Sequence, residues 1–234
     1  MNENQKEVFD QVIEAVNHPV DGQKLFFVDG PGGTSKSFLL EQMLAQVRLQ
    51  KKMAIAVASS GIAATLLTGG HTTHSTFRIT LKLSEFSTQK AELIRNASLI
   101  IRNEAPMMHR ARIEAVDRSF RDIMKNDLEP FGAKRCGDHR QILSVLNDAT
   151  RAETLEACFK SSLLWNHLKK MRLTENKRLR TAPDPASAAE LTEFSEVLFQ
   201  TGEVRYPVNS DINENDICLY RDMCIIPEDS GHYR

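Results

Sequence analysis

One segment limits the possible folds of this chain more than any other: an apolar run, Leu25 to Val28, passes into a glycine-rich turn and a helical pattern that continues to Leu40. Backbone N–H groups of such a turn, with the helix N-terminus behind them, are placed to bind phosphate oxygens. Lys36 would reach the β- and γ-phosphates, and Ser37 would offer its hydroxyl to Mg²⁺. The segment therefore predicts a strand, a phosphate-binding loop and a helix, with cofactor-binding residues Gly30, Gly32, Gly33, Thr34, Ser35, Lys36 and Ser37.

Ser35 departs from the general pattern G-x-x-x-x-G-K-[ST], which has glycine at that position. Its Cβ stands where the backbone must approach the phosphates closely and where the conformational freedom of glycine is normally used. ATP binding is therefore expected, but weakened. The alternative interpretation is a Gly/Pro-rich turn in which Ser35 caps a helix and Lys36 is merely solvated.

Helical and strand patterns alternate along the first half of the chain, which is typical of βαβ units around a parallel sheet. The expected helices cover residues 2–16, 35–50, 62–67 and 108–125, and the expected strands cover residues 25–28, 53–58 and 99–101. Residues 78–95 are expected to contain a small insertion, 181–185 a linker, 187–200 a helix and 217–226 a strand. The sequence thus predicts an α/β fold.

Composition excludes several classes of protein. The net charge of the 234 residues is −1, so a nucleic acid would have to be bound by a local surface and not by a global basic field. The four cysteines lie far apart without metal-ligand spacing, which argues against a zinc site and suits a reducing compartment. No apolar run approaches the roughly 20 residues of a membrane span, and the N-terminus has no signal or transit pattern. An intracellular protein without a membrane partner is expected.

Two polar residues follow the expected strand 99–101. Asn103 and Glu104 stand where a nucleoside triphosphatase carries the residue that orients the water shell of Mg²⁺ and the carboxylate that polarises the attacking water. Glu104 suits the second role, whereas Asn103 can accept a hydrogen bond from a metal-bound water but brings no charge. The alternative is a buried strand that runs into an exposed Asn-Glu turn.

Two further groups of residues could contact a ligand. The segment from Gly137 to Gln141 supplies a turn, a helix cap and a long amide that could sense a γ-phosphate, although taken alone it is only a helix start. Hydroxyls, imidazoles and backbone amides after strand 53–58 suit a phosphodiester backbone. The residues of this second group are Ser59, Ser60, Gly61, His71, His74 and Ser75, and an isolated histidine is as often structural as functional.

Together these segments resemble the Pif1-like family of superfamily 1 DNA helicases, most closely the helicase domains of Helitron-type transposons. MNENQ is similar to the family's adenine-reading motif, with Gln5 as the reader, and FFVDGPGGTSKSFL is similar to FFVDGPGGTGKTFL. The stretches ASSGIAA and HSTF match the segment that grips the DNA strand, and LIIRNEAPM matches L-I-I-x-D-E-x-x-M. GDHRQIL matches GDFRQIL, and LTENKRL matches L-T-E-N-M-R-L. Six motifs in one order across residues 2–179 make the resemblance specific.

The resemblance implies a RecA-like motor domain over residues 1–172 and the start of a second motor domain over residues 173–234. It implies ATP-dependent 5′→3′ DNA unwinding in DNA repair, recombination and telomere maintenance, in the nucleus, with ATP, Mg²⁺ and single-stranded DNA. The catalytic residues would be Lys36, Glu104, Gln141 and Arg178, of which the last two would sense the γ-phosphate. Ser37 and Asn103 would hold Mg²⁺, and DNA would contact Ser60, Gly61, His74, Ser75 and Phe77.

Departures from the family pattern lead to further expectations. Ser35 replaces a glycine, and Asn103 replaces the metal-binding aspartate. Residues 131–138 are about three residues shorter than the family's apolar strand and include Lys134 and Arg135, which do not suit the middle of a sheet buried on both faces. Most of the second motor domain is missing, and one motor domain alone cannot step along a strand. We therefore expect a truncated, weak or inactive copy, unless a partner chain supplies the missing half.

Two other functions stay open. A module that binds ATP or single-stranded DNA without hydrolysis would account for the neutral Asn103. Another P-loop enzyme, such as a nucleotide kinase, could use the same loop, but Gln5 and residues 59–77 would then have no role. DNA-stimulated ATP hydrolysis would exclude the kinase, and binding without hydrolysis would favour the module. Reversion by Ser35→Gly and Asn103→Asp is expected to raise any residual hydrolysis.

Overall fold

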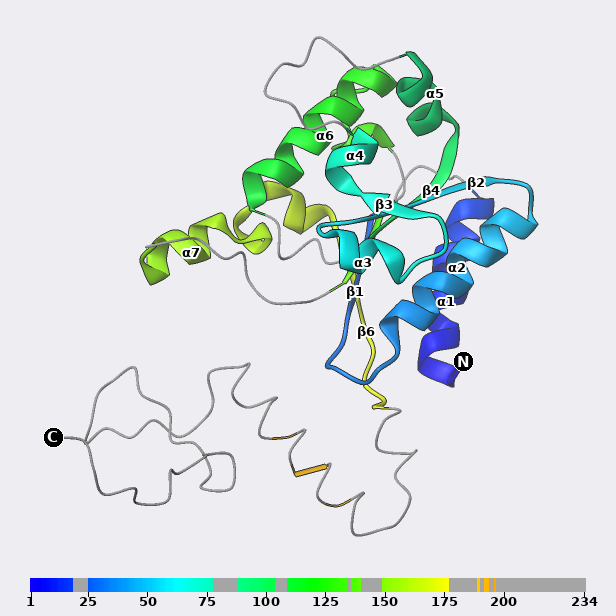
Figure 1. Ribbon diagram of the computed structural model, residues 1–234, viewed down its shortest axis with the longest axis vertical. Helices are drawn as coiled ribbons and strands as arrows, with labels where there is room; N and C mark the ends of the chain where they lie inside the picture. Colours follow the sequence, from blue (N-terminus) through cyan, green and yellow to red (C-terminus); the bar gives the residue numbers. More distant parts are fainter. Residues whose placement is uncertain are drawn as a thin grey trace, which may run out of the picture. The chain divides into compact units, whose positions relative to one another are not determined.

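The computed structural model describes residues 1–18, 25–77, 88–103, 109–133, 136–139 and 149–176, with four single positions beyond them, residues 189, 192, 193 and 196. The chain divides into two compact units, Met1–Lys177 and Arg178–Arg234. The first unit contains the sheet and the helices around it (Figure 1). In the second unit the four described positions are helical.

A single six-stranded sheet forms the centre of the first unit, with the strand order β3-β2-β4-β5-β1-β6. Every pairing in it is parallel. The strands are β1 (Leu25–Asp29), β2 (Met53–Ala58), β3 (Gly70–Thr72), β4 (Ala97–Asn103), β5 (Cys136–His139) and β6 (Lys169–Arg172). This arrangement confirms the predicted α/β fold with a parallel sheet. Because the strands are parallel, their carboxyl ends meet at one edge, where such folds bind ligands.

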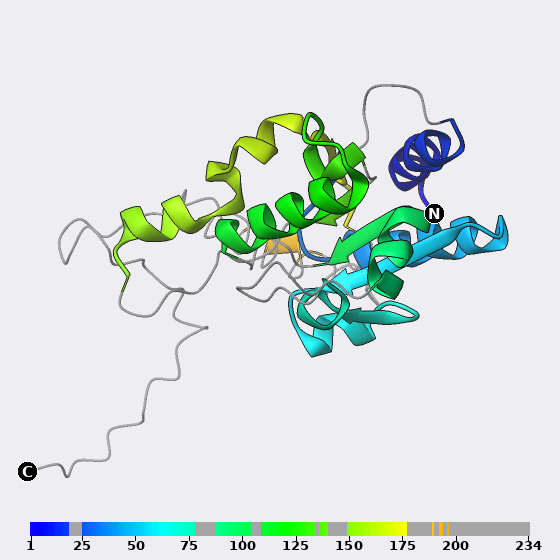
Figure 2. The same ribbon diagram turned by 90° about the horizontal axis from the view of Figure 1, so that it is seen from above.

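Helices cover both faces of the sheet. Helices α1 (Glu3–Asn17) and α2 (Lys36–Leu49) lie on one side of the strands, and α6 (Arg110–Met124) lies on the other (Figures 1 and 2). The face with α6 also packs against α4 (Thr73–Phe77), α5 (Thr88–Asn96) and the 3₁₀ turns η2 (Pro130–Ala133), η3 (Phe159–Ser161) and η4 (Leu163–His167). Helices α3 (Gly61–Thr65) and α7 (Arg151–Ala157) complete the unit.

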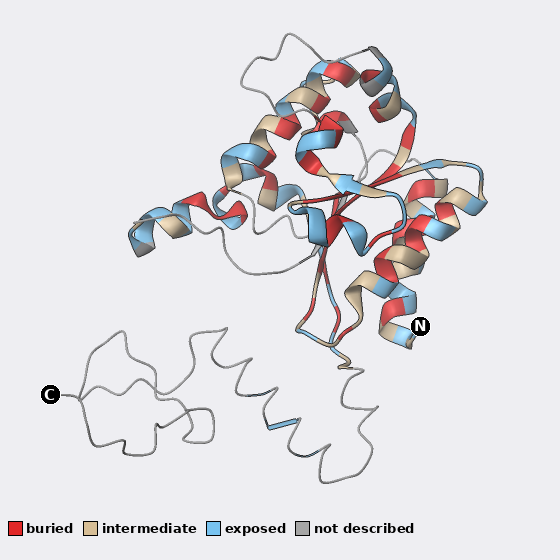
Figure 3. Ribbon diagram, viewed as in Figure 1, coloured by how far each residue is buried: buried red, intermediate tan, exposed pale blue. Residues whose placement is uncertain are grey.

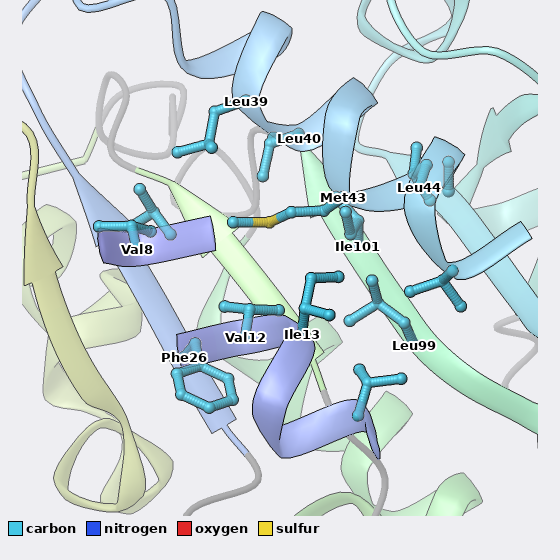
Figure 4. Packing of buried hydrophobic residues seen from close by; sticks show 14 of the residues in the cluster. Val8, Val12, Ile13, Phe26, Leu39, Leu40, Met43, Leu44, Leu99 and Ile101 are labelled. Carbon is cyan, nitrogen blue, oxygen red and sulfur yellow. The ribbon is translucent and has the colours of Figure 1, made fainter. Parts of the chain in front are cut away.

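Buried side chains alternate between the two faces, as the pleat of a strand requires. In β4, Ile100 packs on the side of α6, whereas Leu99 and Ile101 pack against α1 and α2. On the side of α1 and α2, buried residues of these two helices at helical spacing, among them Val12 and Met43, meet over the strands (Figure 4). Figure 3 shows that these buried positions follow the strands and the inner faces of the helices. The apolar runs of the sequence therefore mark strands that are covered on both sides.

The structure corrects the expectation that residues 131–138 do not suit the middle of the sheet. Strand β5 lies between β1 and β4, where Cys136 pairs with Leu25 on one side and with Ile100 on the other. The strand is only four residues long, and Lys134 and Arg135 precede it in the sequence. A short strand that begins after the charged pair can thus occupy a central position.

An unusual turn leads the chain from α6 into β5. Phe131 is buried and has a left-handed backbone with φ 52°, a conformation that costs an ordinary residue about 1–2 kcal/mol. Its N–H donates to Oδ1 of the buried Asp117 at 2.5 Å, and Arg121 Nε donates to the other carboxylate oxygen at 2.8 Å. The guanidinium of the buried Arg102 lies over the Phe131 ring, 5.1 Å from the ring centroid. The hydrogen-bonded carboxylate and the buried ring together hold the strained turn.

Several elements were not predicted, among them α5, β5 and α7. Strand β3 begins at Gly70 and leads into helix α4, and β6 forms at the edge of the sheet beside β1. In β6 only Met171 is buried, so the strand shows no apolar run. The prediction of a turn and a helix cap at Gly137 and Asp138 is wrong, because both residues belong to strand β5. Several other predicted segments lie outside the described residues: residues 140–148 of the expected helix, the linker at 181–185, the strand at 217–226, most of the helix at 187–200 and the first part of the insertion. Across the part of the chain that the structure describes, no helix combines the length and apolar character that a bilayer crossing needs.

Candidate functional site

The predicted phosphate loop, residues 30–37, joins the carboxyl end of β1 to the start of α2. Gly33 has φ +86°, which glycine adopts without strain. Ser35 is also left-handed, with φ 57° and ψ 43°, and its side chain makes no capping hydrogen bond to α2. Ser35 is thus the N-cap residue of α2, but it does not cap the helix through its side chain. At this position the backbone has a left-handed conformation typical of glycine, although the residue is a serine.

Lys36 is held inside the loop. Its Nζ donates to the carbonyl oxygen of Gly30 at 2.6 Å and to that of Pro31 at 3.1 Å. Thr34 is buried, and its hydroxyl donates to the same Pro31 carbonyl at 3.0 Å. The ammonium group and the main chain of the loop thus converge, and the alternative in which Lys36 is merely solvated does not apply. A lysine held inside a glycine-rich loop at a helix N-terminus is an arrangement that suits polyphosphates, because the cation and the N–H groups of such a loop can both contact phosphate oxygens.

Helix α1 is attached to the loop through Gln5. The side chain of Gln5 is 1% exposed, and its Nε2 donates to the Thr34 carbonyl at 2.8 Å. Its Oε1 accepts from Asn2 N, and Asn2 Oδ1 accepts from Gln5 N at 2.7 Å, which forms a capping box at the start of α1. The role of Gln5 as an adenine reader stays a prediction. The contact that the structure records is a buried link between α1 and the phosphate loop.

The segment that follows β6 lies against the same loop. Leu173 N donates to the carbonyl of Asp29 at 2.7 Å, and a Cβ added to Gly30 would lie 3.0 Å from Leu173 Cβ. A Cβ added to Gly33 would lie 2.8 Å from Cγ of Asn176. The loop is therefore enclosed by a segment that lies about 140 residues further along the chain, far beyond the reach of local sequence patterns.

Asn4 connects this segment to α1. Its Nδ2 donates to the carbonyl of Arg172 at 3.2 Å, and its Oδ1 accepts from Thr174 N at 3.1 Å. Neither Asn4 nor Asn176 was singled out from the sequence. Both lie inside stretches that the family resemblance had already marked, MNENQ and LTENKRL, and this is the signal that could have found them.

Ser37 and Asn103, the predicted Mg²⁺ ligands, supply only neutral oxygens. Ser37 is half-buried in the first turn of α2, and Asn103 is buried at the end of β4. Asn103 Oδ1 finds no hydrogen-bond partner among the described residues, so it can accept a hydrogen bond from a metal-bound water. No cluster of three histidine, cysteine or carboxylate residues that could hold a metal occurs within the described ranges. The residues fit a Mg²⁺ ion that arrives with a nucleotide, since the phosphates would supply the charge.

The remaining predicted catalytic residues, Glu104, Gln141 and Arg178, lie outside the described residues. Their roles as activator of water and as γ-phosphate sensors stay predictions.

The predicted DNA-contacting residues lie around α3 and α4, after the carboxyl ends of β2 and β3. Ser60, Gly61, His74 and Ser75 are exposed. Ser60 Oγ accepts from Ala63 N at 3.2 Å and caps α3, and the Ser75 hydroxyl donates to the Thr72 carbonyl at 2.9 Å. These exposed residues lie at the same edge of the sheet as the phosphate loop, next to the exposed apolar side chains of Ile62 and Leu66.

The structure corrects the prediction for Phe77. Its side chain is 1% exposed, and its ring packs edge-on against Phe120 with the centroids 5.1 Å apart. The motif HSTF places one apolar residue on the inner side of a single helical turn, and this residue completes the core beneath α6. Phe77 therefore supports α4 from below and does not present its ring to a base.

Comparison with known proteins identifies relatives of this chain. The family model described as PIF1-like helicase matches residues 1–211. The ATP-dependent DNA helicase Pif1 of Campylobacter jejuni is 31% identical over 169 residues, which are 65% of this chain and 37% of that protein. The ATP-dependent DNA helicase PIF4 of Trypanosoma brucei brucei is 27% identical over 146 residues, which are 56% of this chain and 18% of that protein.

A solved structure shares the fold. The crystal structure of Bacteroides sp Pif1 in complex with ADP-AlF4 has a TM-score of 0.67 and 25% sequence identity, and the alignment covers 90% of this chain and 47% of that one. The chain spans less than half the length of each of these three relatives.

Proposed function

The chain belongs to the PIF1-like helicase family, and from this membership we propose that it is the nucleotide-binding part of an ATP-dependent DNA helicase. The observation that carries the proposal is the phosphate loop, in which the Lys36 ammonium lies 2.6 Å from the Gly30 carbonyl at the end of a buried parallel strand. The Bacteroides relative, solved with ADP-AlF4, supports use of a nucleotide.

ATP binding would use the loop amides and the Lys36 ammonium, which would stabilise the charge of the transferring phosphate. Ser37 and Asn103 would hold Mg²⁺, which would offset phosphate charge when bound. Glu104 would orient the attacking water, and Gln141 and Arg178 would sense the γ-phosphate. Turnover would be slow, because Ser35 places a strained Cβ in the loop and Asn103 brings no negative charge to the metal site.

Single-stranded DNA would bind over Ser60, Gly61, His74 and Ser75. Contacts of this kind reach the phosphodiester backbone, so the affinity should fall as salt rises. A 5′→3′ direction, and roles in DNA repair, recombination and telomere maintenance in the nucleus, belong to the same proposal. They rest on the family resemblance, as does the assignment of residues 173–234 to the start of a second motor domain. Imaging of the tagged chain would test the nuclear location.

A second candidate is a module that binds ATP or single-stranded DNA without hydrolysis. The observation that favours it is Asn103, whose side chain is neutral and already bonded to Ala63. Such a module would retain the loop contacts of Lys36 and lose the chemical step.

One experiment separates the two. ATP affinity is measured with and without Mg²⁺ and an oligonucleotide, and hydrolysis is measured in parallel, with Lys36→Ala as the control that removes the loop cation. Hydrolysis that DNA stimulates and Lys36→Ala abolishes supports the helicase, whereas binding without hydrolysis supports the module. Absence of both nucleotide and DNA binding would refute both.

A further inference from the structure

Asn103 uses its side-chain nitrogen for a specific contact. It is the last residue of β4 and is 1% exposed. Its Nδ2 donates to the carbonyl oxygen of Ala63 in α3 at 3.2 Å, a contact between residues 40 positions apart. The backbone carbonyl of Asn103 also accepts from Ser59 N at 3.3 Å. Residue 103 therefore joins the end of β4 to the segment in which α3 begins.

Helix α3 packs against β2 and β3 through small groups. The helix is five residues long, and its buried side chains, Ala63 and Ala64, form a small cluster with Ala58 of β2. Methyl groups of this number bury little apolar area. Ile62 is 83% exposed, which shows that the outer side of α3 faces away from the core. The buried hydrogen bond from Asn103 therefore adds a directional contact to a packing that is made of small side chains and backbone.

An aspartate could not make this contact. Asparagine and aspartate have the same shape, but an ionised carboxylate has only acceptor oxygens. Opposite the Ala63 carbonyl it would place two acceptors against each other in a buried position, where unpaired polar groups are costly. Asparagine at position 103 therefore has a structural reason that is independent of any metal.

We propose that Asn103 is a positioning residue for single-stranded DNA: its Nδ2 ties α3 to β4 and so fixes the exposed residues Ser60 and Gly61 at the start of this helix. The proposal rests on the proposed DNA-binding function. It follows that Asn103→Asp, the change toward the family pattern, weakens DNA binding. The variant still has an oxygen at the Oδ1 position, and the residues of the phosphate loop are unchanged.

The test uses the full chain and three variants. The main variant is Asn103→Asp, and the matched control is Asn126→Asp. Among the described residues, the side chain of Asn126 acts through its Oδ1, which accepts from Leu128 N at 3.1 Å and from Glu129 N at 3.2 Å. The same chemical change thus removes a donor at one site and preserves an acceptor at the other. Asn103→Ala, which removes the donor without adding charge, covers the case in which Asn103→Asp does not fold.

Three readouts separate positioning from a general loss of structure. They are anisotropy of a labelled oligo-dT, amide exchange of a peptide covering residues 61–67, and amide exchange of a peptide covering residues 39–49 of α2. Asn103→Asp is expected to lose about tenfold in oligo-dT affinity, the loss that corresponds to 1.4 kcal/mol, with faster exchange in the first peptide and unchanged exchange in the second. Asn103→Ala should also speed the exchange in the first peptide, and Asn126→Asp should behave as the unmodified chain.

Unchanged exchange in both Asn103 variants would overturn the proposal, as would equal losses in Asn103→Asp and Asn126→Asp. If the unmodified chain binds no oligo-dT, the proposed DNA-binding function fails. The exchange comparison at α3 would still decide whether Asn103 holds that helix.

Discussion

The phosphate loop and the segment of residues 59–77 lie at the same edge of the sheet but are held in different ways. Two distant parts of the chain contact the loop, Gln5 of α1 and Leu173 after β6, and the Lys36 side chain bonds to the main chain of the loop from within it. The other segment rests on a cluster of alanines, the Asn103 hydrogen bond and a hydrogen bond from the Thr73 hydroxyl to the Ala58 carbonyl at 2.8 Å. The loop can therefore tolerate a strained serine, whereas the second segment depends on single contacts.

The surroundings of the glycines also differ between the phosphate loop and the segment of residues 59–77. In each region at least one glycine has no room for a side chain and another has no neighbour within 4 Å of an added Cβ. The most crowded glycines are Gly33 in the loop and Gly70 in the second segment, and the open ones are Gly32 and Gly61. The neighbour of Gly33 is the side chain of Asn176, and the neighbours of Gly70 are backbone carbonyls. Alanine substitutions at the four positions compare how far each region can adjust.

The largest effect is expected for Gly70→Ala. The new Cβ would overlap the Ala64 carbonyl and lie 2.9 Å from the Leu67 carbonyl, and neither backbone group can move without disturbing α3. We expect a loss of about 2–3 kcal/mol in the free energy of unfolding. Urea unfolding measures it, with Gly61→Ala as the control for stability. Equal stability of the two variants would contradict the view that this segment cannot adjust.

Gly33→Ala should come next, with a loss of about 2 kcal/mol. Its φ of +86° disfavours any Cβ, and the added atom would meet Asn176. The double variant Gly33→Ala with Asn176→Ala relieves the contact but not the backbone strain, so it should recover part of the loss. Calorimetry on these variants, with Gly32→Ala as the control, measures how much of the lost stability comes from the contact with Asn176 and how much comes from the backbone strain. Full recovery in the double variant would show that the backbone conformation costs nothing.

Gln5→Leu should cost about 1–2 kcal/mol, because it leaves the buried carbonyl of Thr34 without its donor. Labelled-ADP affinity should fall as well, since the loop loses its link to α1. Gln11→Leu in the same helix is the control, because the Gln11 contact to Glu7 is exposed. A chain that keeps its nucleotide affinity after Gln5→Leu would show that the loop does not need α1.

The smallest effect, and the only stabilising one, is expected for Ser35→Gly. Glycine removes about 1–2 kcal/mol of left-handed strain, and its extra freedom in the unfolded state returns about 0.4–1 kcal/mol of that gain. The net gain of about 0.5 kcal/mol should raise the unfolding midpoint slightly and strengthen nucleotide binding. A lower midpoint would mean that Ser35 makes a favourable contact in the folded loop.

The sequence allowed prediction of those parts of the fold that depend on local patterns. The apolar runs of β1, β2 and β4 and the glycine-rich turn mark the strands and the loop, because burial on both faces requires uninterrupted apolar residues. Strand β6 escaped prediction since only Met171 in it is buried, and β5 since the charges before it hid a short strand. Local patterns also do not show which way a side chain points in a single helical turn, which explains the error at Phe77.

The candidate site also has one part that local sequence patterns predict and another part that they do not. The spacing of Gly30, Gly33 and Lys36 indicated the loop, because that function resides in consecutive residues. The contacts of Asn4 with Arg172 and of Asn103 with Ala63 join distant residues and leave no trace in local spacing. Polar contacts of this kind become visible only once the sheet brings the strand ends together.

The fewest strand pairings among the described residues join the part of the sheet beside the phosphate loop to the part beside α3 and α4. There β5 pairs with β4 at two positions, whereas β2 and β4 pair at six and β1 and β5 at four. Helix α2 crosses this junction, because it starts at the phosphate loop and packs against both β2 and β4. A displacement of the loop would therefore reach the opposite half of the sheet through α2 as well as through β5.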